Sequence, residues 1–246
     1  MAKYIILDTE TTGTSEKDRI IQLGYIVLGA PEVEVYNELC SSDIAIEIGA
    51  MEVHNIVPDM IEGKPSCVET EAYKRLEALN TPDNYMIIHN APFDLGMLKK
   101  EGFESQMQLI DTLRVAKHLL PESDYHRLQY LRYSLELYKN EDAEAKKLGV
   151  ELKAHDALGD VIFLKMLLSK LTELTGEKGI KAVAKMVALS GEPVEIKKPM
   201  RFGKHKGKTI QELAETESGY LKWMLKNMQN LDEDTCYTIN KVLGHL

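Results

Sequence analysis

The segment YIILDTE at residues 4–10 decides the fold that the sequence predicts. Its continuous apolar run ends abruptly in acids, a pattern typical of a strand that is buried on both faces. Because side chains on a strand alternate between its faces, Asp8 and Glu10 should point the same way. Carboxylates this close must be protonated, paired with bases or bridged by cations, and no Lys or Arg stands between Lys3 and Lys17. The segment is therefore either a pair of solvated acids entering a turn or half of a divalent-metal site.

Further strands and helices follow from the same kind of pattern. Residues 19–28 form a second apolar run, and residues 33–39 alternate between apolar and polar side chains, so an antiparallel meander of three strands is expected. Residues 85–89 and 109–111 are two more strands, each leading into a helix. Helices are predicted over residues 50–55, 58–62, 66–79, 92–102, 112–120, 128–135, 157–176, 177–190, 220–225 and 234–243, and one more is expected to begin at Thr209. The helix over residues 66–79 is expected to begin at the capping box formed by Ser66 and Glu69.

The overall composition excludes several classes of protein. The chain has 246 residues, of which 44% are apolar and 28% charged, so it is long enough for one large or two smaller domains. Its longest apolar runs fall short of the roughly 18 residues of a membrane span, and no signal-peptide layout is present. Three scattered cysteines fit neither a disulfide framework nor a zinc site, which favours the reducing cytoplasm. The net charge of −9 argues weakly against general binding to a polyanion.

Three further residues could complete a site with the first two acids. Asp94 lies in the first turn of a predicted helix, just after a buried strand, where it could equally be an acid that favours the helix dipole. Asp160 lies on an amphipathic helix whose N-cap is Asp156, and alone it would be read as a solvated acid. His155 precedes that cap and could be a packing or capping histidine. If it lies in the loop before the helix, it can fold back over the site that Asp160 faces.

The composition changes near the C-terminus. Residues 197–208 (KKPMRFGKHKGK) carry six Lys or Arg and one His with no acid, and the two glycines predict a small basic turn or hairpin. We therefore divide the chain into a main domain over residues 1–176, a helix and linker over 177–195, and a C-terminal basic module over 196–246.

Three motifs in order resemble those of a known enzyme superfamily. DTETTG at residues 8–13, HNAPFDLGML at 89–98 and HDALGD at 155–160 closely resemble the exonuclease motifs of DEDD-superfamily 3′–5′ exonucleases. The His-x4-Asp form of the third motif is similar to the DEDDh subgroup. MRFGKHKGKTIQEL and YLKWML in the basic module resemble the C-terminal extension of exodeoxyribonuclease X-like proteins.

This resemblance implies an α/β fold of the ribonuclease H-like type, with a mixed five-stranded sheet flanked by helices. It also implies a catalytic set in which four acids bind two divalent ions, Mg²⁺ or Mn²⁺, and a histidine is the general base. Onto this chain it carries the acids Asp8, Glu10, Asp94 and Asp160 and the base His155. Implied substrate contacts are Thr11, Thr12, His54 and Asn90, for the last two of which packing or turn capping is the alternative. The basic run suggests nucleic-acid contacts at Lys204, Lys206 and Lys208, although such a run can also be only a solvated surface.

The expected function is a two-metal-ion 3′–5′ exonuclease that releases nucleoside monophosphates from DNA, with single-stranded ends preferred. Two other enzymes fit the motifs, an RNA 3′-trimming exonuclease of the ribonuclease T or oligoribonuclease kind and a polymerase proofreading subunit. A non-catalytic nucleic-acid-binding protein would have no need of an intact acid cluster, which costs stability without metal. The implied partners are DNA or RNA 3′ ends, with a DNA polymerase or repair complex and a homodimer left open, and no membrane.

Overall fold

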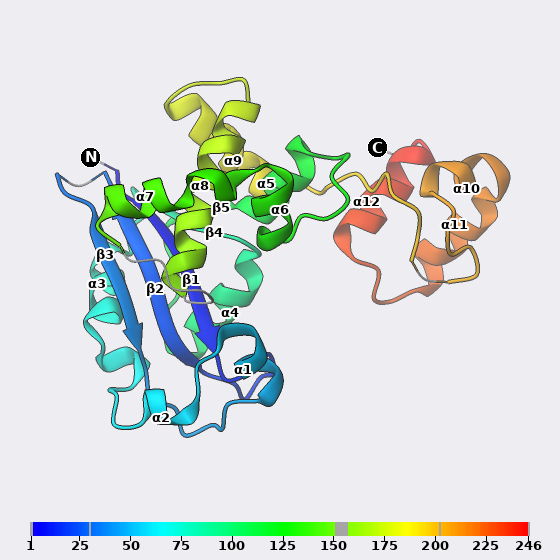
Figure 1. Cartoon of the computed structure of the whole chain (residues 1–246). Coiled ribbons are helices and arrows are strands. Elements are labelled where there is room, and N and C mark those ends of the chain that lie inside the picture. Colours follow the sequence, from blue (N-terminus) through cyan, green and yellow to red (C-terminus); the bar gives the residue numbers. More distant parts are fainter. Residues whose placement is uncertain (1, 30, 151–156, 202, 246) are drawn as a thin grey trace.

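The computed structural model describes residues 2–29, 31–150, 157–201 and 203–245 (Figure 1). His155 and Asp156 lie outside these ranges, so the model does not test the expectations for the histidine base and the helix N-cap. Figure 1 shows a large unit built on a sheet, and a small all-helical unit that holds the C-terminus. In the described part of the chain, no helix is both long and apolar enough to span a membrane.

The predicted mixed sheet is confirmed. Its strands are β1 (Tyr4–Thr11), β2 (Ile20–Leu28), β3 (Glu34–Leu39), β4 (Tyr85–Ile88) and β5 (Gln108–Asp111). Among the described residues they form one five-stranded sheet in the order β3-β2-β1-β4-β5. The β1–β2 and β2–β3 pairs are antiparallel, and the β1–β4 and β4–β5 pairs are parallel. The acid-bearing strand is therefore central, with a neighbour on each side.

Helices cover both faces of the sheet. The longer helices of the large unit are α3 (Glu71–Leu79), α4 (Ala91–Lys100), α5 (Thr112–Leu119), α8 (Ala157–Leu174) and α9 (Ile180–Gly191). Ile5 and Leu7 of β1 belong to the core that α3 and α4 cover, whereas Ile6 belongs to the core that α8 covers. The apolar run of β1 is thus buried on both faces, as its sequence predicted.

Shorter helices complete the large unit, and one of these helices and the start of α3 differ from the prediction. They are α1 (Ile48–His54), α2 (Pro58–Ile61), α6 (Leu128–Ser134) and α7 (Glu141–Leu148). Helix α7 was not predicted, because its mostly polar segment buries only Ala145. The Ser66 capping box is present, but it begins a 3₁₀ turn (Cys67–Glu69), and Thr70 caps α3. The predicted start of that helix was wrong because two capping residues stand four positions apart, and the second begins the α-helix.

The C-terminal unit has a core of its own. It consists of α10 (Ile210–Thr216), α11 (Ser218–Asn227) and α12 (Glu233–Val242), packed through Ile210, Leu213, Leu221, Met224 and Ile239. The basic run before it closes as a turn, because the backbone of Met200 bonds with Lys208 (2.8 Å) and Gly207 (2.9 Å). The predicted turn is therefore present.

Candidate active site

Two of the predicted acids emerge side by side where β1 ends. Asp8 and Glu10 are both partly exposed, while Thr9 between them is buried, as expected for alternating faces. The pairing of β1 with β2 shifts register between Glu10 and Thr11, which marks the end of the regular strand. Two carboxylates therefore open to the same side at a β-bulge, a feature common next to active sites.

The third acid of this group, Asp160, comes from the first turn of α8. One oxygen from each of Asp8, Glu10 and Asp160 lies within 4.8 Å of the others. The start of α8 comes this close because β2 has a glycine there, since a Cβ on Gly24 would lie only 2.8 Å from the Cβ of Ala157. Gly24 is also the residue paired with Asp8. A missing side chain thus allows helix and strand to bring their acids together.

Asp94 approaches the same group from the buried side. Asp94 lies in the first turn of α4, after Asn90, whose backbone is left-handed (φ 72°). Only 3% of the Asp94 surface is exposed. Its Oδ1 accepts hydrogen bonds from the backbone N–H (3.1 Å) and the hydroxyl (2.7 Å) of Thr9. The carboxylate of Asp111 at the end of β5 accepts the N–H groups of Asn90 (3.1 Å) and Ala91 (3.2 Å), which holds the turn.

The four acids interact electrostatically. Burial, and then the nearby charges of Asp94, Asp160 and Glu10, raise the pKa of Asp8 well above its usual range. Burial raises the pKa of Asp94 to about 7, although the hydrogen bonds from Thr9 oppose this shift. A cluster that resists full ionisation becomes stable when cations neutralise it. Carboxylate oxygens are also the ligands that hard divalent cations prefer. The donor set therefore fits divalent-metal use.

Gln129, which the sequence analysis did not identify, contacts the acid cluster. Its side-chain amide in α6 donates to Oδ1 of Asp160 at 2.7 Å, and its own oxygen accepts from Arg132 at 3.2 Å. The only signal in the sequence was its place on a short helix, far along the chain from the acids. Thr9 was equally hard to identify, because a threonine inside a strand needs no function.

The predicted substrate residues lie in two settings. Thr11, Thr12 and His54 are buried around the turn that follows β1, whereas Asn90 is exposed. The Thr12 hydroxyl donates to Asp18 (2.8 Å), and His54 lies between the carbonyl of Thr11 (3.2 Å) and the N–H of Ile56 (2.9 Å). Burial lowers the pKa of His54, so the ring is neutral and its Nε2–H donates to Thr11. These contacts hold the turn beside the acids.

The lysines of the basic turn are in the C-terminal unit and not in the acid cluster. The side chains of Lys204 and Lys208 each lie 3.9 Å from Glu217, and all three of Lys204, Lys206 and Lys208 are exposed. The same glutamate lies 3.1 Å from His205, which is buried. Glu217 thus pairs with the basic turn and reduces the net positive charge there.

Comparison with known proteins agrees with this geometry. The Exonuclease family model matches residues 5–167, and the Exodeoxyribonuclease X-like C-terminal model matches residues 200–229. Exodeoxyribonuclease 10 of Escherichia coli K12 is 26% identical over 243 residues, which cover 97% of either chain. A PolC-type DNA polymerase III of Bacillus cereus is 30% identical over 184 residues, or 72% of this chain but 12% of the polymerase.

A solved structure shares the fold. Exonuclease X in complex with 5′ overhanging duplex DNA superimposes with a TM-score of 0.56 at 22% identity, covering 78% of this chain and all of that one. The residues matched by the family model include all four acids, from β1, α4 and α8. The chain belongs to the exonuclease family, and it is a 3′–5′ exonuclease.

Proposed function

We propose that the chain hydrolyses phosphodiester bonds from the 3′ end of single-stranded DNA and releases nucleoside monophosphates. The observation that carries this proposal is the convergence of Asp8, Glu10 and Asp160 within 4.8 Å, with Asp94 buried beside Asp8. Four carboxylates carry more negative charge than one divalent ion neutralises, so two ions, Mg²⁺ or Mn²⁺, fit this charge. Bound ions of this kind would activate a water and neutralise the leaving oxygen.

The four acids would divide the work of holding the ions. Asp8 would be shared, because its charge interacts with those of Asp94 on one side and of Glu10 and Asp160 on the other. Glu10 and Asp160 would belong to the side where water attacks, and Asp94 to the side of the leaving group. Thr9 would fix the Asp94 carboxylate through its two hydrogen bonds, and Gln129 would orient Asp160.

His155 is the proposed general base. It lies five residues before Asp160 in the sequence, and histidine is the side chain that most often acts as a general base near neutral pH. Its role would be to take the proton from the attacking water, a contribution typically worth about 10²–10⁴ in rate. The four acids and His155 are thus the proposed catalytic residues.

The terminal nucleotide would lie beside the turn that follows β1. Thr11, Thr12 and His54 shape this turn, and Asn90 is the N-cap of α4, the helix that carries Asp94, so we propose these four as substrate contacts. Lys204, Lys206 and Lys208 are proposed as weaker contacts to phosphates. DNA is the proposed substrate because the relative that matches over 97% of both chains is an exodeoxyribonuclease.

Two other functions use the same site. RNA 3′-trimming would need side chains that recognise the 2′-hydroxyl. Polymerase proofreading is favoured by the match to a PolC-type polymerase, which would make a polymerase the partner, but that match spans only 12% of the polymerase. We also propose domain limits at residues 176 and 195 and a cytoplasmic location. A repair complex and a second copy of the chain are further proposed partners.

One assay separates these functions. DNA and RNA oligonucleotides of the same sequence, labelled at the 5′ or the 3′ end, are incubated with Mg²⁺ in the presence or absence of EDTA. We expect release of 3′-labelled mononucleotide from single-stranded DNA, and no release with EDTA. Faster release from RNA would favour trimming, and release of the 5′ label as mononucleotide would contradict the proposed polarity.

A further inference from the structure

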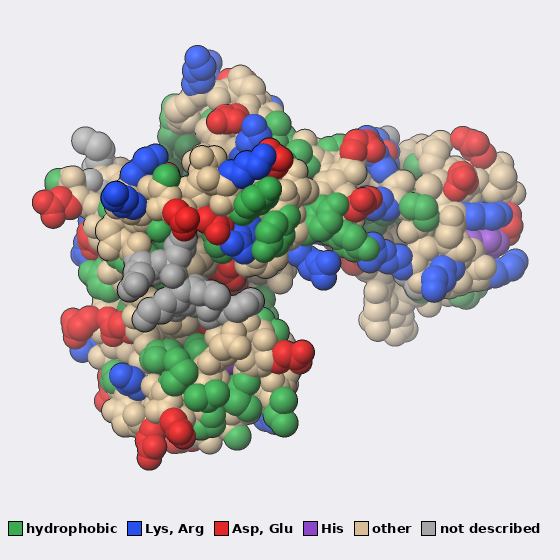
Figure 2. Space-filling view, viewed as in Figure 1, with side chains coloured by type: hydrophobic (Ala, Val, Ile, Leu, Met, Phe, Trp, Pro, Cys, Tyr) green, Lys and Arg blue, Asp and Glu red, His purple; other side chains and the backbone are tan. Residues whose placement is uncertain are grey.

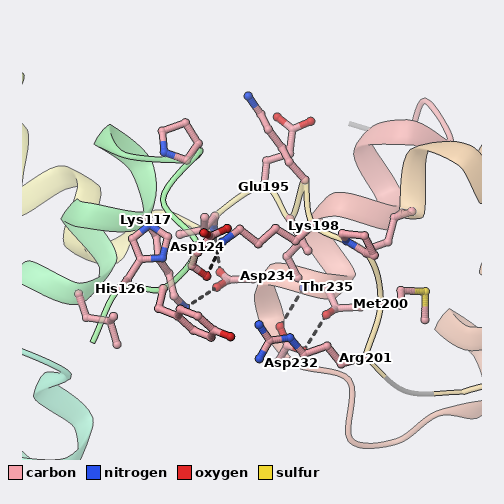
Figure 3. A pocket seen from close by; sticks show the side chains of 18 of the residues that line it. Lys117, Asp124, His126, Glu195, Lys198, Met200, Arg201, Asp232, Asp234 and Thr235 are labelled. Carbon is pink, nitrogen blue, oxygen red and sulfur yellow. Dashed lines mark hydrogen bonds and ion pairs between the residues drawn. The ribbon is translucent and has the colours of Figure 1, made fainter. Parts of the chain in front are cut away.

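A pocket of about 490 Å³ lies between the two units, away from the acid cluster. Figure 3 shows that its walls come from the segment after α5, from the linker and from the start of α12. Lys198, near the start of the C-terminal module, fixes this arrangement, because its ammonium donates to the carbonyls of Ser123 and Asp124, the latter at 2.6 Å. The two units thus build one shared surface.

An exposed aromatic ring at this pocket is flanked by two guanidinium groups. Tyr125 is 43% exposed. The guanidinium carbon of Arg127 lies 5.0 Å from the centroid of its ring, and that of Arg201, from the C-terminal unit, lies 5.7 Å away. Tyr130 supports the ring edge-on, with centroids 5.2 Å apart. The two guanidinium groups thus lie over the ring, and an exposed stack of aromatic and arginine side chains is a surface on which single-stranded nucleic acid is commonly held.

Three of the four acids that line the pocket, all except Asp124, have partners. Asp234 accepts from Arg114 (3.1 Å) and from the N–H of Val194 (2.8 Å), and Asp232 caps α12. Glu195 is paired with Lys241 at 2.6 Å. These contacts neutralise or occupy three of the carboxylates around the pocket.

The flanking arginines are different. In the described part of the chain, neither Arg127 nor Arg201 has a carboxylate within 4.0 Å. Figure 2 shows Lys and Arg side chains gathered along the lower edge of the connection between the two units. The pocket therefore offers positive charge to an anionic ligand.

Helix α6 links the pocket to the acid cluster along the chain. Arg127 immediately precedes α6, whose Gln129 donates to Asp160. His89, at the end of β4, donates its Nε2–H to the carbonyl of His126 (2.8 Å). Tyr125 and Gln129 are four positions apart in the sequence, which limits their Cα separation to about 14 Å. At about 3.4 Å per stacked nucleotide, a strand spans this distance with about four nucleotides.

We propose that this pocket binds the single-stranded DNA on the 5′ side of the terminal nucleotide. A base packs against the exposed part of the stack that Tyr125 forms with the two arginines, and its neighbouring phosphates contact Arg127 and Arg201. The C-terminal unit then contributes to substrate binding through Arg201, which lies in the basic turn and lines the pocket at the junction of the two units. This inference rests on the proposed function, because it assumes that the strand leaves the acid cluster toward α6.

The test compares oligothymidylates of 3 and 15 nucleotides, because only the longer one reaches the pocket. The variants are Tyr125→Ala and the double variant Arg127→Gln/Arg201→Gln, and Tyr125→Phe keeps the ring as a conservative control. Lys178→Gln/Lys181→Gln removes the same charge from exposed positions in and just before α9. Fluorescence anisotropy in EDTA gives the affinity, and initial rates in Mg²⁺ give kcat and KM.

For the 15-mer we expect Tyr125→Ala and the double arginine variant to weaken binding and raise KM by about tenfold. The arginine variant should also lower the slope of log affinity against log salt by about 1–2. Tyr125→Phe and the α9 control should bind the 15-mer as wild type does, and all variants should bind the trimer within about twofold. Equal loss for both lengths, or unchanged 15-mer binding, would overturn the inference. Failure of wild type to hydrolyse either substrate would instead contradict the proposed function.

Discussion

Thr9 has no catalytic chemistry of its own, but it holds the carboxylate of Asp94, a proposed metal ligand, in place. Its hydroxyl and N–H both donate to Asp94, a carboxylate with a raised pKa. Such contacts around a metal ligand are typically worth 10–100-fold in metal affinity. They could not be predicted from the sequence, because they join residues 85 positions apart. The acids could be predicted, because strand alternation and the position after a buried strand are local properties.

Thr9→Val should weaken Mn²⁺ binding by about tenfold, because the hydroxyl donor to Asp94 is lost while the shape of the side chain is kept. Calorimetric titration of the metal measures this change. Thr9→Ser keeps the donor and should bind Mn²⁺ within about twofold of wild type. If the valine and serine variants bind equally well, Thr9 does not position Asp94.

His155→Ala should lower kcat by about 10²–10⁴ because the proton acceptor is removed, while Mn²⁺ affinity should stay close to wild type. The two quantities are measured on the same preparation by initial rates and by calorimetric titration. Hydrolysis at a near-wild-type rate would remove His155 from the mechanism.

At the level of elements, the approach of α8 to β2 determines the site. Gly24 has no Cβ, and the start of α8 packs against it. The amphipathic pattern predicted the helix but not this contact, since a glycine inside a strand is compatible with several environments. Helix α7 could not be predicted for a related reason, because only one of its residues is buried and the segment has no apolar face to recognise.

Gly24→Ala should destabilise the protein by about 1–3 kcal/mol, because the added methyl would overlap Ala157 and push the first turn of α8 away. Since that turn carries Asp160, activity should fall as well. Gly219→Ala in α11 meets no atom within 4 Å and is the matched control. It should stabilise by about 0.5–1 kcal/mol through helix propensity. Urea unfolding measures both, and a Gly24→Ala variant as stable as wild type would contradict the close packing.

His89 connects β4 to the segment before α6, and it predicts a pH dependence of stability. Burial lowers its pKa to about 4 in the folded state, whereas the unfolded value is about 6.5. The unfolded chain therefore binds the proton first as pH falls. The contribution of the neutral His89 to the free energy of unfolding is complete above about pH 6.5 and is lost toward pH 4. The loss over this window is roughly 3 kcal/mol. His89→Gln should remove this pH-dependent loss of stability. If the free energy of unfolding of the two proteins falls equally between pH 6.5 and pH 4, the assignment to His89 is contradicted.

For the whole molecule, the sequence predicted the sheet and the separate C-terminal helices but not how the two units meet. Buried strands and amphipathic helices have periodic patterns that a single segment contains. The junction instead depends on single contacts between distant segments, such as Arg114 with Asp234 and Lys198 with the carbonyls of residues 123 and 124. The pocket between the units is thus visible only in three dimensions.

The central claim is that acids from β1, α4 and α8 form one site for divalent ions. The most direct measurement is anomalous diffraction from crystals soaked in Mn²⁺, with Asp8→Asn crystals as the control. Our account predicts two peaks bounded by Asp8, Glu10, Asp94 and Asp160, both reduced or lost in the control. An ordered acid cluster with no peak among these four side chains, at a Mn²⁺ concentration that supports hydrolysis, would contradict it.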